Sequence, residues 1–242
     1  MSLSITLLHG WAVDPENEAK WEQFRTVLKR KGFETRFLPI PGLFSPLDTA
    51  WGLNEYVQWL HSQLKSNKKT ILLGHSFGGQ LVSRFSARYP EKVAALILVD
   101  SAGIRDRSPL VVLKRGVFKI AATVGKQLTK APLLRNLLYR LARERDYLEA
   151  SPTLRRTMTA VLADEVIQDL PNITAPTCII WGEKDTATPL KLAYTFSSLL
   201  QNAQLHIVSG ARHSPQFTHP TIVAEYVSAF LRAEFPQSER RV

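Results

Sequence analysis

The stretch that decides the fold lies at residues 70–79 and reads Thr70-Ile71-Leu72-Leu73-Gly74-His75-Ser76-Phe77-Gly78-Gly79. Its first residues form a short, continuously apolar run, which is typical of a strand covered on both faces. From Phe77 onward the sequence follows a helical pattern that stops at Pro90. Glycines on both sides of a serine let a strand and a helix approach closely at a sharp turn, which holds the hydroxyl clear of the sheet. We therefore expect Ser76 to be a nucleophile rather than an incidental serine in a glycine-rich turn.

Short apolar runs and longer helical patterns alternate on both sides of this turn. Further strands are expected at residues 5–8, 35–40, 93–99, 177–181 and 205–208. Most of these runs are separated by an amphipathic helical pattern. The repeated strand–helix–strand order implies right-handed crossovers. The fold class is therefore α/β, with a mostly parallel, doubly wound sheet.

Residues 104–170 break this alternation. They contain no strand pattern, and their apolar residues recur at helical spacing in several stretches. We expect an all-helical cap inserted over the carboxyl edge of the sheet, so that residues 1–103 and 171–242 form the core. Asp164 and Asp169, near the end of this insertion, are expected to be solvated helix charges.

A serine becomes an effective nucleophile when a histidine accepts its proton and an acid orients that histidine. After a turn of this kind, the acid and then the histidine are expected further along the chain. Asp185 follows one predicted strand and His213 lies in the loop after the next, on the edge from which Ser76 emerges. Asp100, which also ends a strand, is the competing acid.

The other histidines fit the role of the base less well. His75 adjoins Ser76 and cannot easily turn its ring onto that hydroxyl, and His206 lies within a strand. His61 and His219 are expected at the surface. The sequence has no His-Glu-x-x-His pair, cysteine cluster or glycine-rich phosphate loop, so we expect neither a metal nor a cofactor.

Composition indicates an ordinary globular protein. Of 242 residues, 45% are hydrophobic and 21% charged, a balance that argues against a disordered or fibrous chain. The longest apolar run is too short to span a membrane, and the first residues lack the pattern of a signal peptide. A single cysteine, Cys178, excludes an internal disulfide and is expected to be a buried thiol. These features favour a cytoplasmic location.

The net charge of +10 is concentrated in the predicted cap. Residues 105–156 carry 13 Lys and Arg against 4 Asp and Glu. One interpretation is the solvated faces of amphipathic helices. The other is a docking surface for an acidic partner such as an acyl carrier protein, or for an acidic substrate or membrane surface. Nucleic-acid binding is not expected, because no nucleic-acid motif accompanies the charge. The predicted docking residues are Arg135, Arg140, Arg143, Arg155 and Arg156.

Four motifs together resemble the α/β-hydrolase superfamily over nearly the whole chain. They are His9-Gly10-Trp11, Gly74-His75-Ser76-Phe77-Gly78-Gly79, Trp181-Gly182-Glu183-Lys184-Asp185 and Gly210-Ala211-Arg212-His213. Their form is most similar to carboxylesterases that act on pimeloyl-carrier-protein methyl esters. The resemblance implies an oxyanion hole made by the backbone N–H groups of Trp11 and Phe77. It also implies a sheet of about six strands, because the chain begins at the family's third strand.

These observations lead to the hypothesis of a serine carboxylesterase that hydrolyses small to medium acyl esters through an acyl-enzyme. Trp11, Phe44 and Phe77, together with Leu or Val residues of the cap helices, are candidates for the walls of its acyl pocket. Two alternatives remain open. One is a C–C bond hydrolase or aminopeptidase that uses the same triad, and the other is a receptor of this fold with negligible turnover.

Overall fold

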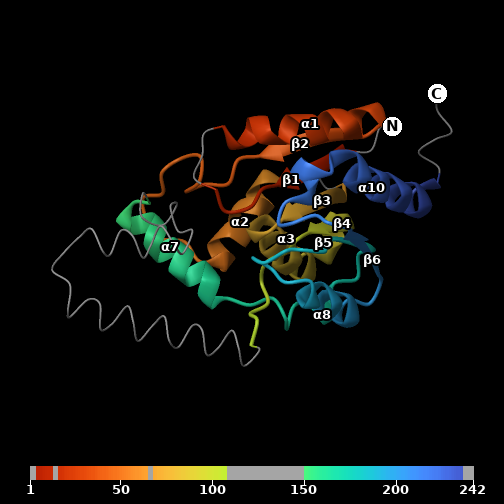
Figure 1. Ribbon diagram of the computed structural model, residues 1–242. Coiled ribbons are helices and arrows are strands. Elements are labelled where there is room, and N and C mark those ends of the chain that lie inside the picture. Colours follow the sequence, from red (N-terminus) through yellow and green to blue (C-terminus); the bar gives the residue numbers. More distant parts are fainter. Residues whose placement is uncertain (1–3, 13–15, 65–67, 108–149, 237–242) are drawn as a thin grey trace.

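A computed structural model gives the fold, and it describes residues 4–12, 16–64, 68–107 and 150–236 (Figure 1). Strands and helices alternate along most of this part of the chain. The strands are β1 (Ser4–Leu8), β2 (Glu34–Leu38), β3 (Thr70–His75), β4 (Val93–Val99), β5 (Thr177–Gly182) and β6 (Ala203–Val208). The helices are α1 (Asn17–Arg30), α2 (Leu53–Gln63), α3 (Phe77–Arg88), η1 (Pro90–Lys92), α7 (Pro152–Ala163), η2 (Leu170–Asn172), α8 (Lys191–Leu199), α9 (Pro215–Thr218) and α10 (Pro220–Glu234).

The six strands form one parallel sheet in the order β2-β1-β3-β4-β5-β6. This confirms the predicted fold class and strand number. The chain first winds outward from β1 to β2 and then continues on the other side of β1 with β3. Ligands of doubly wound sheets bind where the winding direction reverses, outside the carboxyl ends of the strands. In this protein that place lies between the ends of β1 and β3.

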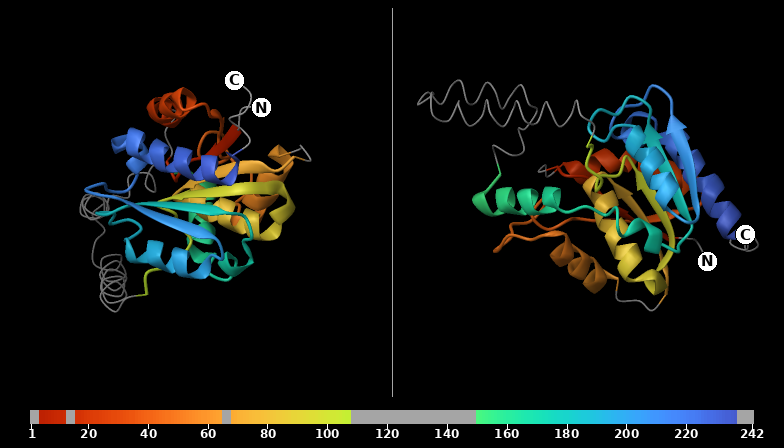
Figure 2. Two further views of the ribbon diagram at one scale, coloured as in Figure 1. Left: turned by 90° about the vertical axis from the view of Figure 1, so that its right-hand side faces the viewer. Right: turned by 90° about the horizontal axis from the view of Figure 1, so that it is seen from below.

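Two hydrophobic clusters fill the two faces of the sheet. One contains the apolar faces of α1 and α10, with Trp21, Phe24 and Val227 fully buried. The other contains α2, α3 and α8, with Tyr56 and Phe196 among its buried members. Figures 1 and 2 show α1 and α10 on one face and α2, α3 and α8 on the opposite face. Because both faces are covered, the central strands are continuously apolar rather than alternating.

Helix α7 lies outside these two layers, on the side of α2 and α3 (Figure 2). Gln80 on α3 holds the end of this helix: its Nε2 donates to the carbonyl oxygens of Val161 in α7 and of Asp164 directly after it, at 3.2 and 3.1 Å. Residues 108–149, the remainder of the predicted cap, lie outside the described residues.

The acids that follow α7 are not solvated charges, contrary to the sequence-based expectation. Arg84 on α3 donates through Nη1 to Asp164 and through Nε to Asp169, at 2.9 Å in each case. Its Nη2 donates to the carbonyl oxygen of Glu165 at 2.6 Å. A guanidinium presents a rigid fork of donors, which suits it to hold several acceptors at once. Arg84 therefore fixes the chain segment between α7 and β5 to the helix that follows Ser76.

Candidate active site

Ser76 occupies a strained turn between β3 and α3. Its backbone has φ 51° and ψ −116°, and its N–H donates to the carbonyl oxygen of Val99 at 3.1 Å. Such a conformation costs on the order of 1–3 kcal/mol and is found mainly at functional sites. Two glycines permit the close packing behind it: a Cβ on Gly74 would lie 2.4 Å from the Gly78 carbonyl oxygen, and one on Gly78 would lie 2.3 Å from that of Leu8. The turn thus has the geometry expected of a nucleophile turn.

Asp185 and His213 are joined by a hydrogen bond. Nδ1 of His213 lies 2.8 Å from Oδ2 of Asp185. The same carboxylate oxygen accepts from Thr188 Oγ1 at 2.7 Å, while Oδ1 accepts from the backbone N–H groups of Ala187 and Thr188 at 2.7 and 3.0 Å. The acid is buried and fully hydrogen-bonded, so it can orient the imidazole and balance a positive charge on it.

The surroundings of this pair favour its charged forms. Burial raises the pKa of Asp185, but the hydrogen bonds from His213 and Thr188 and the charge of His213 outweigh it, and the net shift is downward. Burial lowers the pKa of His213, but the hydrogen bond to Asp185 and the charges of Asp185 and Asp100 outweigh it, and the net shift is upward. Asp185 therefore stays ionised where His213 titrates.

Ser76 and His213 line the same cavity, which has a volume of about 160 Å³. Because Asp185 occupies Nδ1, Nε2 is the nitrogen of His213 that is left for the serine. No hydrogen bond joins Ser76 Oγ to His213 among the residues that the structure describes. Hydrogen bonds between nucleophile and base are often long until reactants bind. Ser76 and His213 thus line one cavity, and Asp185 is hydrogen-bonded to His213.

Two backbone N–H groups at this site lack an acceptor in the described part of the chain. Phe77 is the first residue of α3, where N–H groups have no partner within the helix, and Trp11 lies in the loop after β1. Gly10, which precedes Trp11, packs so closely that a Cβ would lie 2.8 Å from Nδ1 of His75. These groups lie at the ends of β1 and β3, where the resemblance places the oxyanion hole. That role remains a prediction.

The rival residues have other partners. His75 Nε2 lies 3.1 Å from Ser214 Oγ, so this ring points away from its neighbour Ser76. His206 stacks on Tyr226 with a centroid separation of 4.4 Å. Asp100 Oδ2 lies 4.0 Å from His213 Nδ1, beyond hydrogen-bond distance and farther than Asp185. The geometry therefore favours Asp185 as the acid.

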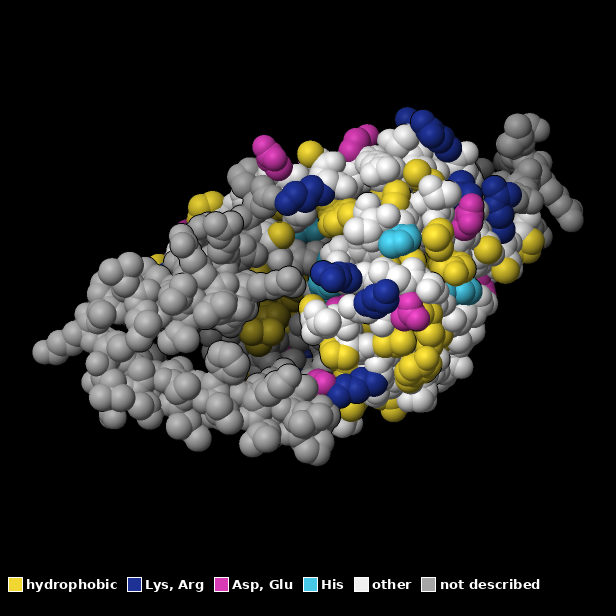
Figure 3. Space-filling model, in the orientation of Figure 1, with side chains coloured by type: hydrophobic (Ala, Val, Ile, Leu, Met, Phe, Trp, Pro, Cys, Tyr) yellow, Lys and Arg dark blue, Asp and Glu magenta, His cyan; other side chains and the backbone are white. Residues whose placement is uncertain are grey.

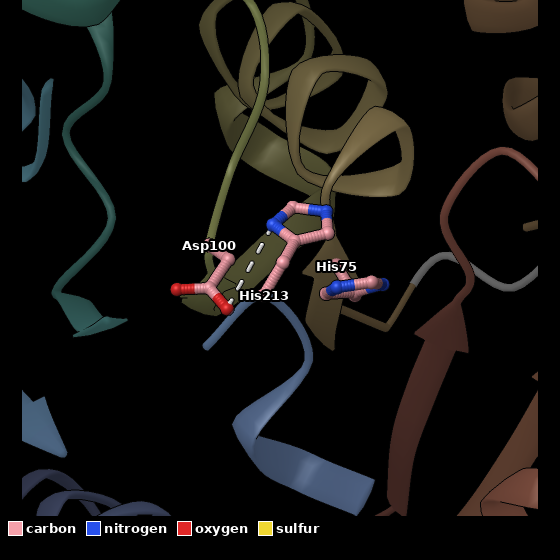
Figure 4. A group of neighbouring side chains, drawn as sticks. All are labelled: His75, Asp100 and His213. Atoms are coloured by element: carbon pink, nitrogen blue, oxygen red, sulfur yellow. Dashed lines mark ion pairs between the residues drawn. The ribbon is translucent and has the colours of Figure 1, made fainter. Parts of the chain in front are cut away.

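One group of side chains in the described ranges has the composition of a metal site: His75, Asp100 and His213, shown in Figure 4. Their potential ligand atoms lie within 4.8 Å of one another. The Nδ1 atom of His213 that faces Asp100 is already hydrogen-bonded to Asp185, and both oxygens of Asp100 accept backbone N–H groups. A cation here would have to break these contacts, so the group is better explained by the hydrogen-bond network.

A larger cavity of about 680 Å³ lies between α7, the loop after β4 and the loop after β5. It adjoins the triad through Thr188, and its apolar lining includes Ile104, Val161, Leu162 and Leu192. Figure 3 shows a hollow with hydrophobic side chains at its floor. Val161 and Leu162 belong to α7, within the predicted cap, from which Leu or Val wall residues were expected. Ile104 and Leu192 were not identified from the sequence, because an apolar residue has the same pattern whether it packs in the core or faces a cavity.

Of the three aromatic residues predicted to line the pocket, one lines a cavity and two do not. Trp11 lines the smaller cavity, whereas Phe44 and Phe77 line neither of the two cavities described. Phe44 packs against His9 with ring centroids 5.0 Å apart, and Phe77 packs against Trp11 at 5.4 Å. Phe77 therefore supports the Trp11 wall from behind, whereas Phe44 packs against the hydrophobic core.

The predicted basic docking surface is only partly within the described residues. Arg155, half-buried, and Arg156, exposed, belong to α7. Arg135, Arg140 and Arg143 lie outside the described residues. The docking of an acidic carrier protein stays a prediction.

Cys178 is fully buried in β5, and burial raises the pKa of its thiol to about 12. It is therefore the inert thiol that the sequence predicts. Among the helices of the described residues, none combines the length and the apolar character that crossing a bilayer requires.

Comparisons with known proteins agree with this fold. The chain is 25% identical over 266 residues to a pimeloyl-[acyl-carrier protein] methyl ester esterase of Wigglesworthia glossinidia brevipalpis, covering 96% of this chain and 94% of that protein. It is 22% identical over 265 residues to the biotin biosynthesis bifunctional protein BioHC of Teredinibacter turnerae, covering 98% of this chain but only 46% of that protein. A putative lipase from Acinetobacter baumannii has the same fold, with a TM-score of 0.73 at 21% identity over 98% of this chain and 86% of that one.

The family comparison covers most of the sheet and the site. Residues 34–220 match the family model of the alpha/beta hydrolase fold. This range includes the turn at Ser76 and the loops that carry Asp185 and His213. The chain therefore belongs to the α/β-hydrolase family, whose members include esterases.

Proposed function

We propose that this hydrolase is a serine carboxylesterase with Ser76 as nucleophile, His213 as base and Asp185 as the orienting acid. The observation that carries the proposal is the 2.8 Å contact of His213 with Asp185 beside a cavity that Ser76 also lines. The strained backbone of Ser76 supports the same assignment. The esterase named among the relatives agrees with it.

The reaction follows from the positions of these groups. His213 Nε2 accepts the proton of Ser76 as Oγ attacks the ester carbonyl carbon, and Asp185 stabilises the imidazolium. The N–H groups of Trp11 and Phe77 stabilise the oxyanion; one such donor is worth about 10²–10³ in rate. The imidazolium then protonates the leaving alcohol as the ester C–O bond breaks. Water, deprotonated by His213, hydrolyses the acyl-enzyme and restores Ser76.

The two cavities suggest how an ester would bind. We expect the acyl chain to lie in the cavity of about 680 Å³, whose lining is largely apolar, and a small alcohol group to lie in the one of about 160 Å³ beside Ser76. An assay of the purified protein on p-nitrophenyl esters of increasing acyl length tests this assignment of the two cavities. We expect multiple turnovers with an initial burst, and the highest kcat/KM on a medium-length acyl chain.

Other results of that assay would contradict the proposal. Absence of turnover on every ester would indicate a receptor of this fold. Absence of ester turnover together with turnover of vinylogous β-diketones or aminoacyl amides would indicate a C–C hydrolase or an aminopeptidase. A preference for acetate over all longer chains would contradict the assignment of the larger cavity to the acyl chain.

Activity is expected to rise with pH through the pKa of His213, because only the neutral imidazole can accept the serine proton. The charges of Asp185 and Asp100 hold this pKa above its ordinary value of 6.5 in spite of burial. The half-maximal point of kcat/KM should therefore lie above pH 6.5. A profile of log kcat/KM on p-nitrophenyl acetate, with folding verified at each pH, measures it. A profile already flat below pH 6.5 would contradict this assignment.

A further inference from the structure

Asp100 is a buried carboxylate that the reaction above does not use. It follows β4, its side chain is 0% exposed, and its backbone has a positive φ of 43°. Ser76, Asp100 and Ser214 are the non-glycine residues with positive φ among those described, and all three lie in this site. A strained backbone and a buried acid each cost free energy, so the contacts of Asp100 must offset both.

Those contacts join two loops. Oδ1 of Asp100 accepts the backbone N–H of Gly182 at 2.8 Å, and Oδ2 accepts that of Ser214, also at 2.8 Å. Gly182 ends β5, three residues before Asp185, and Ser214 directly follows His213. One carboxylate therefore bridges the chain segments that carry the orienting acid and the base.

The bridge continues toward the nucleophile. Ser214 Oγ lies 3.1 Å from Nε2 of His75, the residue before Ser76. The carbonyl oxygen of Asp100 accepts from Thr188 Oγ1 at 3.2 Å, and that hydroxyl also reaches Asp185 Oδ2 at 2.7 Å. Asp100 and its partners thus connect the ends of β3, β4, β5 and β6.

Figure 4 shows Asp100 and His75 beside the ring of His213, with Asp100 on the Nδ1 side. At 4.0 Å from Nδ1, Asp100 does not replace Asp185, but its carboxyl group faces the imidazole. We propose that Asp100 is a positioning residue, which sets the distance between base and nucleophile by holding the Gly182 and Ser214 amides. This proposal rests on the proposed function of the site.

Two substitutions separate the carboxylate from the backbone conformation. Asp100→Asn keeps the shape and accepts positive φ, but its NH₂ must face one of the two N–H donors, so one hydrogen bond is lost. Asp100→Gly also accepts positive φ but removes both acceptors. We expect kcat to fall about 10- to 100-fold in Asp100→Asn and further in Asp100→Gly, with KM changed much less, because the misplaced loops impair geometry rather than binding.

A pH profile gives a readout that loss of packing alone would not produce. The charged or titratable groups that face His213 are Asp185, Asp100 and His75. Burial raises the pKa of Asp100 to about 7, so this group carries its full charge only above that pH. Loss of the charge should lower the pKa of His213, so the acid limb of kcat/KM should move to lower pH in both variants. The acid limb should keep its wild-type position in Asp169→Asn, which removes a carboxylate bound to Arg84 and remote from the triad.

The outcomes are distinguishable from failure of the esterase assignment. If Asp100→Asn and Asp100→Gly both keep wild-type kcat and acid limb while Ser76→Ala is inactive, the positioning role is wrong and the esterase assignment stands. If Asp100→Gly is active and only Asp100→Asn is impaired, the backbone bridge is wrong. If Ser76→Ala stays active, the proposed function itself fails. The kinetics of each variant are measured below its melting temperature. If one of the two Asp100 variants does not fold, the kinetics of the other are sufficient to overturn the proposal.

Discussion

Replacing Ser76 by alanine is expected to lower kcat for ester hydrolysis by about 10⁴- to 10⁶-fold, the loss that removal of a triad nucleophile produces. Its Oγ is the atom that forms the acyl-enzyme. Among the described residues, Ser76 is the serine that follows β3 with a positive φ. The fold should be retained, because Ser76 is partly exposed. The hydrogen bond that ties this residue to Val99 is made by its backbone N–H and not by its side chain. Burst amplitude and steady-state rate on a p-nitrophenyl ester measure the loss.

A serine on the same helix provides the control for this variant. Ser86 in α3 is buried, and its Oγ donates to the Val82 carbonyl oxygen at 2.7 Å, away from the cavities. Ser86→Ala is therefore expected to keep kcat near the wild-type value. If Ser76→Ala turns over the ester as fast as Ser86→Ala, a group other than Ser76 performs the attack.

Replacing Asp185 by asparagine is expected to lower kcat by about 10³- to 10⁴-fold through the tautomer of His213. The Ala187 and Thr188 N–H groups both point at Oδ1, so the asparagine carbonyl will turn to them. Its NH₂ group then faces His213 Nδ1, which must accept rather than donate. The proton of the neutral ring moves to Nε2, the nitrogen that Asp185 leaves for the serine, and Nε2 can then no longer act as a base.

The comparison of acids makes this variant decisive. Asp185→Asn, Asp100→Asn and Asp169→Asn are each measured for kcat, KM and melting temperature. We expect the largest loss of kcat in Asp185→Asn, an intermediate loss in Asp100→Asn and none in Asp169→Asn. If Asp185→Asn kept near-wild-type kcat while Asp100→Asn lost it, the catalytic acid would be Asp100, and the order of the triad along the chain would change.

The sequence was sufficient for the fold because the signals were local. Continuously apolar runs identified strands covered on both faces, and the glycines around Ser76 identified the turn; the parallel six-stranded sheet confirms this interpretation. In a parallel sheet all carboxyl ends share one edge. Residues that follow β3, β5 and β6 were therefore expected together, and Asp185 and His213 do lie in contact.

The sequence predicted Asp185 as the acid, but it gave no role to the competing Asp100. Asp100 and Asp185 both follow a central strand, and only the turn after β5 decides which of them reaches His213 Nδ1. The same limit applies to Asp164 and Asp169, whose partner Arg84 lies 80 residues or more away along the chain. Contacts of this separation depend on packing rather than on local pattern. For the same reason Ile104 and Leu192 were not identified as lining of the larger cavity.

Mass spectrometry of the protein after reaction with a fluorophosphonate tests the central claim most directly, because the reagent marks only a serine that is activated by its neighbours. The account predicts one adduct per chain, located on Ser76 by peptide mapping and absent from His213→Ala. An unmodified protein, or an adduct on Ser214 beside His75, would contradict it.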